Sequence, residues 1–270
     1  MKHARVAFRG AIRSGVVHEH DRRIIFRDGS NANFKEVVWL PPVEPRTVFA
    51  LGLNYADHAT ELSFNAPTQP LVFLKGPRAF VGHRGCSPCP ADVQQMHSEC
   101  ELCVVIGRAG RQIPSDRAYE YVTGYTVAND YALRDYLENF YRPNLRVKNR
   151  DYCTPLGPWL VDAADIADPM NLQLRSWVNG KPVQNGSTRD MIFTVPKLIE
   201  YLSSLVTLSP GDLILTGTPS GVVFVKPGDE VITEIESVGR LVNTIVAETI
   251  NVRDSDSADE TKPIQAPISN

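Results

Sequence analysis

The chain lacks the charge and the long apolar runs that mark proteins acting on nucleic acids or in membranes. Its 270 residues have a net charge of only −3, so no surface that attracts nucleic acid or an anionic membrane is expected. No stretch approaches the roughly 18 consecutive apolar residues of a membrane-spanning helix. Residues 1–10 also lack the apolar core of a signal peptide, and we therefore expect a cytoplasmic protein.

A complete zinc site is missing too, although the five cysteines include two pairs with zinc-ligand spacing, Cys86 with Cys89 and Cys100 with Cys103. Residues three apart in a strand face opposite sides of the sheet, so Cys100 and Cys103 are not expected to share an ion. The other two thiolates cannot close a tetrahedral site by themselves. We therefore predict five free thiols, as is usual in a reducing compartment.

Composition and proline content divide the chain into three predicted parts. A hydrophobic content of 43% is enough to fill a sizeable core. Residues 1–44 hold two short β-rich runs and end in a proline-rich segment, which predicts a small N-terminal β-rich domain. Residues 45–250 form the predicted main domain. Residues 251–270 are acidic and polar with almost no apolar side chains, and we expect a disordered tail.

Two glutamates directly precede an apolar run that is typical of a buried strand. In a strand, Glu99 and Glu101 share one face, whereas Leu102, Val104 and Ile106 share the other. The two carboxylates then lie about 7 Å apart and repel each other at low dielectric unless one is protonated or a cation lies between them. A solvated strand face explains the pair equally well when it is taken alone.

Further polar side chains occur where the pattern changes from strand to helix. His58 and Glu61 lie three apart in a short predicted helix, where they form either an oriented imidazole–carboxylate pair or a surface ion pair. Asp130 follows the predicted strand 121–128 and precedes a predicted helix over 131–141. An aspartate there either caps the helix or provides a third oxygen ligand from a strand end.

The rest of the chain predicts a few more elements and one basic cluster. Periodicity predicts a helix over 191–206 and a hairpin that pairs 230–236 with 240–247. A strand over 213–215 runs into the glycine-containing turn 216–221, which has no phosphate-loop pattern. Four basic residues lie within nine positions, and a solvated face explains them as well as a binding site does. These are Arg142, Arg146, Lys148 and Arg150.

Taken in order, these motifs resemble the fumarylacetoacetate hydrolase family over about residues 45–248. They are His58 with Glu61, Glu99-x-Glu101, Asn129-Asp130 with Arg134-Asp135, Lys148 and the turn 216–221. The resemblance implies a β-rich α+β fold, a mixed β-sandwich roll with a small N-terminal β domain, usually as a homodimer. It also implies Mg²⁺ or Mn²⁺ held by Glu99, Glu101 and Asp130. Three carboxylates are hard oxygen donors, which suit those ions better than zinc.

The same resemblance assigns roles to the remaining candidates. His58, oriented by Glu61, would be the acid/base group, and Lys148 would neutralise a bound carboxylate or enolate. Substrate-binding roles fall to Arg134, Tyr141, Arg142, Arg146 and Thr218. Guanidinium groups suit the carboxylates of a 2-oxo or 2-hydroxy di- or tricarboxylate.

Residues 39–55 and 136–150 are most similar to one branch of the family, which breaks down 4-hydroxyphenylacetate. This implies decarboxylation of 5-oxopent-3-ene-1,2,5-tricarboxylate and isomerisation of 2-hydroxyhepta-2,4-diene-1,7-dioate, with or without a paralogous subunit. Leu137 stands where hydrolytic members commonly carry glutamine, which disfavours hydrolysis. Two alternatives stay open. One is an acylpyruvate or fumarylpyruvate-type hydrolase or oxaloacetate decarboxylase on the same fold, and the other is a catalytically silent, metal-binding member.

Overall fold

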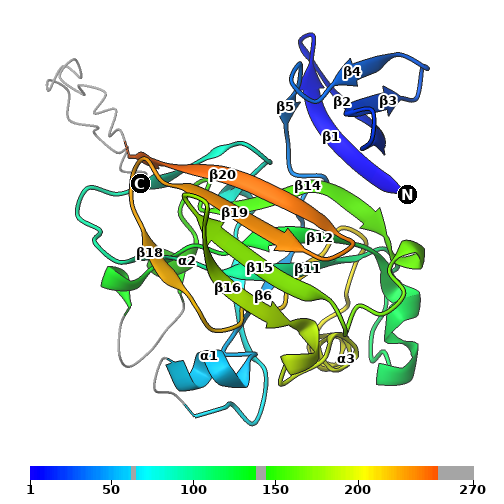
Figure 1. Ribbon diagram of the computed structural model, residues 1–270. Helices are drawn as coiled ribbons and strands as arrows, with labels where there is room; N and C mark the ends of the chain where they lie inside the picture. The colour runs from blue at the N-terminus through cyan, green and yellow to red at the C-terminus, as the bar shows by residue number, and fades with distance from the viewer. Residues whose placement is uncertain (62–64, 138–143, 249–270) are drawn as a thin grey trace, which may run out of the picture.

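Strands make up most of the described chain, which comprises residues 1–61, 65–137 and 144–248 of a computed structural model (Figure 1). The predicted tail 251–270 lies outside the described residues, as do Tyr141 and Arg142. The strands are β1 (Lys2–Phe8), β2 (Ala11–His18), β3 (Arg23–Phe26), β4 (Asn31–Asn33), β5 (Val38–Trp39), β6 (Val48–Gly52), β7 (Leu71–Lys75), β8 (Phe80–Val81), β9 (Cys86–Cys89), β10 (Met96–Ser98), β11 (Cys100–Ile106), β12 (Val122–Asn129), β13 (Ala132–Leu133), β14 (Thr154–Asp162), β15 (Gln173–Val178), β16 (Lys181–Ser187), β17 (Leu213–Leu215), β18 (Val223–Val225), β19 (Glu230–Ile235) and β20 (Gly239–Ala247).

The helices are few and short. The α-helices are α1 (Ala56–Glu61), α2 (Leu145–Lys148) and α3 (Val195–Leu205), and the 3-10 turns are η1 (Pro77–Ala79), η2 (Ser115–Tyr121), η3 (Arg134–Tyr136), η4 (Ala163–Asp165) and η5 (Thr188–Asp190). In α3 the buried residues Val195, Leu198, Ile199 and Leu202 recur at helical spacing, which places them on one face toward the core.

Two sheets packed face to face form the body of the molecule. The 12-stranded sheet has the order β4-β3-β2-β1-β14-β12-β11-β17-β6-β7, with β5 beside β1 and β8 beside β14. The five-stranded sheet, β16-β15-β19-β20-β9, covers strands β11, β12 and β14 of the large sheet (Figure 1). Most pairs are antiparallel, but β17–β6, β14–β8 and β20–β9 are parallel. This mixed sandwich confirms the predicted β-rich α+β class.

The N-terminal strands continue the large sheet, because β1 pairs with β14 through Lys2 and His3. Trp39, in β5, is buried and packs edge-on against the His83 ring, with centroids 5.2 Å apart. Residues 1–44 are therefore joined to the rest of the chain by main-chain hydrogen bonds and by the packing of an aromatic side chain. The division of the chain at residue 44 stays a prediction.

The predicted hairpin over 230–247 and the helices near 54–62 and 191–206 are confirmed as β19–β20, α1 and α3. The helix predicted over 131–141 is wrong in its described part. There Ala132 and Leu133 form β13, paired with Met96 and His97 of β10, before the short turn η3. Residues 131–133 are all almost completely buried, so strand pairing in the interior outweighed the local helix propensity.

His83 gives the fold an expected pH dependence. Its Nδ1 accepts a hydrogen bond from the Val242 N–H at 3.1 Å, which requires an unprotonated Nδ1. Burial lowers the pKa of His83 to about 3, and the Arg84 charge adds to the shift. The unfolded chain, with a histidine pKa near 6.5, thus binds more protons than the folded one, so stability falls as pH drops below that value.

We expect the unfolding free energy to fall by about 2 kcal/mol more in the native protein than in the His83→Gln variant between about pH 7 and pH 5. The glutamine can keep the acceptor for the Val242 N–H without a titrating group. Urea unfolding of both proteins at the two pH values measures the difference. Equal losses in the two proteins would contradict this role of His83.

Candidate metal centre and active site

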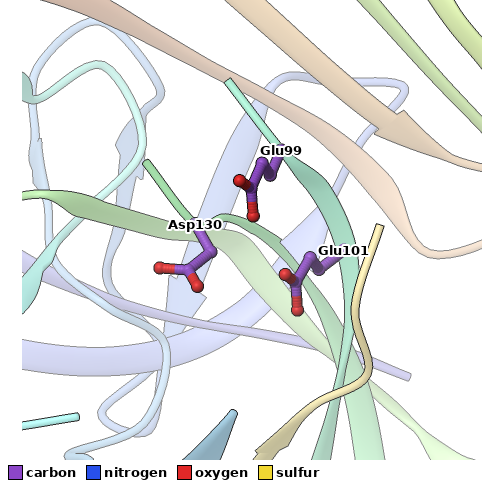
Figure 2. A group of neighbouring side chains, drawn as sticks. All are labelled: Glu99, Glu101 and Asp130. Atoms are coloured by element: carbon purple, nitrogen blue, oxygen red, sulfur yellow. The ribbon is translucent and has the colours of Figure 1, made fainter. Parts of the chain in front are cut away.

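Three buried carboxylates converge where β11 and β12 meet at one end (Figure 2). Glu99 directly precedes β11, Glu101 is its second residue and Asp130 directly follows β12. The antiparallel register pairs Cys100 with Asn129, and the Asp130 N–H donates to the Glu99 carbonyl at 2.9 Å. One oxygen from each carboxylate lies within 4.8 Å of the others. The side chains therefore form a group that could hold a metal ion.

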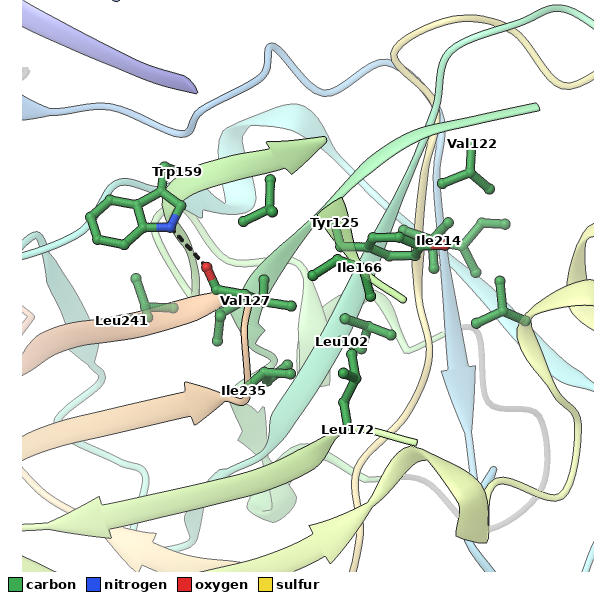
Figure 3. Packing of buried hydrophobic residues seen from close by; sticks show 14 of the residues in the cluster. Leu102, Val122, Tyr125, Val127, Trp159, Ile166, Leu172, Ile214, Ile235 and Leu241 are labelled. Carbon is green, nitrogen blue, oxygen red and sulfur yellow. Dashed lines mark hydrogen bonds between the residues drawn. The ribbon is translucent and has the colours of Figure 1, made fainter. Parts of the chain in front are cut away.

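Strand alternation separates this site from the core between the sheets. Leu102, the neighbour of Glu101, packs in the buried cluster that includes Val127 and Ile235 (Figure 3). Cys100 belongs to that same cluster, whereas Cys103 lies in a second cluster on the opposite face of the sheet. All five cysteines are free. The two thiols three apart thus face opposite sides, as predicted, and cannot share a zinc ion.

Two lysines neutralise part of the acidic group. Lys148, at the end of α2, donates to Glu99 Oε2 at 2.6 Å and to the Asp130 carbonyl at 3.0 Å. Lys75, at the end of β7, donates to Asp130 Oδ1 at 2.6 Å and also to the Lys148 carbonyl. The Lys75 side chain has no exposed surface. The sequence interpretation missed Lys75, although the alternation of β7 places it inward beside Phe73, where a lysine is rare.

The remaining charge favours a cation. With all three carboxyl groups ionised, the two ammonium groups leave one negative charge uncompensated. The pKa of Glu101 lies well above its ordinary value because the carboxyl is buried, and the Asp130 charge raises it further. Burial would also raise the pKa of Asp130, but the charges of Lys148 and Lys75 outweigh it and hold that pKa below its ordinary value.

An unsatisfied oxygen at the same place supports a metal ligand role. Asp130 Oδ2 lies 3.0 Å from Lys148 Nζ but, among the described residues, accepts no hydrogen bond of acceptable geometry. A buried carboxylate oxygen without a donor is costly unless a cation or water completes it. The donor set of three hard oxygens therefore fits Mg²⁺ or Mn²⁺.

A cavity of about 150 Å³ lies beside the carboxylates. Several of the predicted functional side chains reach its wall. Among the lining residues are the polar His58, Glu99, Arg134, Lys148 and Thr218 and the apolar Leu53, Leu71, Phe73, Leu137 and Val147. The cavity lining thus combines charged and apolar side chains.

The structure brings His58 and Glu61 together as predicted. His58 Nδ1 lies 3.0 Å from Glu61 Oε2, which leaves Nε2 as the free ring nitrogen. The second carboxylate oxygen, Oε1, accepts the Gly221 N–H at 3.0 Å. Glu61 is therefore held from two sides, and the imidazole is oriented at the cavity wall.

The turn 216–221 connects these groups. The Gly217 N–H donates to Glu101 Oε2 at 2.8 Å, and the Ser220 hydroxyl donates to Asp57 Oδ2 at 2.7 Å. Gly221 has φ +92°, and a Cβ there would lie 2.4 Å from the Val183 carbonyl oxygen. Only glycine fits this position. The turn thus contacts both the group of three carboxylates and the helix that carries His58.

The other predicted substrate contacts differ in their placement. Arg134 and Thr218 line the cavity. Arg146 does not line it; its guanidinium lies over the Tyr136 ring, 4.4 Å from the centroid. Tyr141 and Arg142 lie outside the described residues. The roles of all these residues stay predictions.

Residues 47–246 match the model of the fumarylacetoacetate hydrolase C-terminal domain. The chain belongs to the fumarylacetoacetate hydrolase family. This confirms the resemblance inferred from the motifs. Among curated relatives, the chain is 60% identical over 202 residues to the 4-hydroxyphenylacetate degradation bifunctional isomerase/decarboxylase of Salmonella dublin. The match covers 75% of this chain and 47% of the relative, so the chain spans about half the length of that protein.

Solved structures of similar proteins superpose well on the chain. A 5-carboxymethyl-2-hydroxymuconate delta-isomerase from Mycobacterium smegmatis gives a TM-score of 0.81 at 35% identity, covering 92% of this chain and 100% of the other. The structure of maleylpyruvate hydrolase from Sphingobium sp. SYK-6 in complex with manganese(II) and pyruvate gives a TM-score of 0.79 at 27% identity, with the same coverage of both chains. The fold is therefore shared by proteins named for isomerisation and for hydrolysis.

Within the part of the chain that the structure describes, no helix has the length and apolarity needed to cross a membrane.

Proposed function

We propose that the chain catalyses the metal-dependent decarboxylation of 5-oxopent-3-ene-1,2,5-tricarboxylate and the isomerisation of 2-hydroxyhepta-2,4-diene-1,7-dioate. The observation that carries the proposal is a single cavity lined by Glu99, Lys148 and His58, with Glu101 and Asp130 beside Glu99. The named activity of the Salmonella dublin relative supports it. Both reactions need positive charge and a proton-transfer group at one cavity, since each develops negative charge on a 2-oxo oxygen.

Glu99, Glu101 and Asp130 would hold Mg²⁺ or Mn²⁺. When bound, such an ion supplies Lewis acidity toward a 2-oxo oxygen. The manganese in the maleylpyruvate hydrolase structure supports this choice of metals. Three protein ligands leave octahedral positions open for a 2-oxo acid.

The residues of the chain then provide charge and a proton path. Loss of CO₂ sends the electron pair of the broken C–C bond through the conjugated double bond to the 2-oxo oxygen. The Lys148 ammonium lines the cavity beside Glu99 and would stabilise that charge. His58 Nε2, oriented through the Nδ1–Glu61 contact, would move the proton between the hydroxyl oxygen and the distant carbon during isomerisation.

Water exclusion distinguishes this chemistry from hydrolysis on the same fold. Leu137 lines the cavity and can neither hold nor orient a water molecule. Hydrolysis stays the second candidate, because the His58–Glu61 pair has the geometry of a general base and the structural relative from Sphingobium is named a hydrolase. The cytoplasmic location and the homodimer stay predictions.

A product assay separates these functions. We expect the Mg²⁺-loaded protein to release CO₂ from the tricarboxylate and to leave an acylpyruvate intact. Coupled CO₂ detection and chromatographic analysis of the products measure both reactions. Cleavage of the acylpyruvate to pyruvate and an acid, without CO₂ release, would refute the decarboxylase in favour of the hydrolase. Metal binding without either turnover would instead indicate a silent member.

A further inference from the structure

A buried glutamine outside the predicted site joins the metal strand to the cavity wall. Gln184 lies in β16 of the five-stranded sheet and is 2% exposed. Its Oε1 lies 3.0 Å from the Cys100 nitrogen and 3.0 Å from Ser176 Oγ. Its Nε2 lies 2.8 Å from Thr218 Oγ1 and 2.9 Å from the Pro219 carbonyl oxygen. All four hydrogen-bonding positions of the amide are therefore used.

Two of these partners determine which way the amide points. The Cys100 N–H can only donate, so it must meet the amide oxygen, and the Pro219 carbonyl can only accept, so it must meet the amide nitrogen. It follows that Nε2 also donates to Thr218 Oγ1, which acts as the acceptor.

The direction of the Thr218 hydroxyl proton follows from this. Because Oγ1 accepts from Gln184, its own O–H must donate elsewhere. No acceptor within the described ranges receives a hydrogen bond from it, and Thr218, 3% exposed, lines the cavity. The hydroxyl therefore presents a donor to the cavity.

We infer that Gln184 is a positioning residue that makes Thr218 a hydrogen-bond donor to a carboxylate or 2-oxo oxygen of a bound 2-oxo acid. The inference rests on the proposed function, since it takes the ligand of the cavity to be a 2-oxo acid. The same amide accepts a hydrogen bond from the N–H of Cys100, the residue between Glu99 and Glu101. One side chain thus sets the metal ligands and the substrate donor relative to each other across the two sheets.

Pyruvate binding to the Mn²⁺-loaded protein tests the inference without any turnover. Thr218→Val removes the donor and keeps the side-chain shape, so we expect pyruvate to bind on the order of tenfold more weakly. Thr218→Ser keeps the hydroxyl and should bind within about twofold of the native protein. Gln184→Met should also weaken pyruvate binding about tenfold, because Thr218 Oγ1 then loses the N–H donor that fixes the direction of its own proton.

The double variant separates positioning from general structural support. If Gln184 acts through Thr218, adding Gln184→Met to Thr218→Val should weaken pyruvate binding by less than about twofold further. Independent losses that multiply would overturn the inference. Ser176→Ala is the matched control, since it removes a hydrogen bond to the same amide without touching Thr218, and it should bind pyruvate as the native protein does.

Titration calorimetry measures Mn²⁺ first and pyruvate second in each variant. If Gln184→Met does not fold or does not hold Mn²⁺, the two Thr218 variants decide: equal pyruvate affinity in Thr218→Val and the native protein would overturn the inference. Because pyruvate is the probe, absence of activity on the tricarboxylate would refute the proposed function and leave this result intact.

Discussion

Replacing Glu101 with glutamine should reduce metal-dependent activity by at least about 1,000-fold while the protein stays folded. The ligand carboxylates would hold an ion whose Lewis acidity is worth several kcal/mol, and each 1.4 kcal/mol corresponds to about a factor of ten. Glu101 is the most informative of the three, because its carboxyl has no ammonium partner within salt-bridge distance among the described residues.

The fold should tolerate this change for a physical reason. The pKa of Glu101 is raised by burial and by the Asp130 charge, so without a cation the side chain favours its neutral form. Glutamine has nearly the same shape and can still accept the Gly217 N–H. Circular dichroism and thermal unfolding of the metal-free protein should therefore match the native protein.

Mn²⁺ affinity and the rate of CO₂ release are the measurements that check this prediction. Glu236→Gln, at an exposed carboxylate far from the three ligands in sequence, serves as the control and should keep both. Native activity of Glu101→Gln with saturating Mn²⁺ would refute the ligand assignment.

Replacing Lys75 with methionine should lower the unfolding free energy of the metal-free protein by about 3–5 kcal/mol. Lys75 is completely buried and donates to Asp130 Oδ1 and to the Lys148 carbonyl. Methionine fills a similar volume but leaves the buried Glu99 and Asp130 carboxylates with Lys148 as their one remaining ammonium partner among the described residues. The loss is therefore electrostatic rather than a cavity effect.

Added Mn²⁺ should restore part of that stability, because an ion at the carboxylates supplies the missing positive charge. Urea unfolding with and without Mn²⁺ measures both effects. Lys197→Met is the matched control: its partner Glu200 lies 2.9 Å away on the exposed surface of α3, so the change should cost less than about 1 kcal/mol. Equal losses of unfolding free energy in the two variants would contradict the stabilising role of the buried Lys75 ammonium.

Local patterns in the sequence predicted the parts of the site that depend on neighbouring residues. The alternation around Glu99 and Glu101 placed both side chains on the face away from Leu102, and the three-residue spacing of His58 and Glu61 placed them in contact. These two relations follow from the geometry of one strand or one helical turn. Asp130 was assigned beside the glutamates through the family resemblance, because its place after a strand left helix capping open as well.

The parts that were missed depend on residues far apart in the chain. Lys75 meets Asp130 across 55 positions, and Gln184 meets Cys100 across 84 positions and between two sheets. The helix predicted after Asp130 failed for the same reason, since Leu133 pairs with Met96 in another strand. Pairing and burial of this kind are decided by topology, which one sequence read locally does not contain.

The turn 216–221 limits how the cavity could be redesigned to test the proposed substrate range. Its main chain holds Glu101 and Glu61, and its Thr218 is held by Gln184. A new side chain or a changed loop length there would disturb the carboxylate group, the His58–Glu61 pair and Thr218 together. Leu71 and Leu137 also line the cavity and lie outside the turn. Directed evolution toward longer or shorter dicarboxylates should therefore find its productive mutations at these two apolar residues.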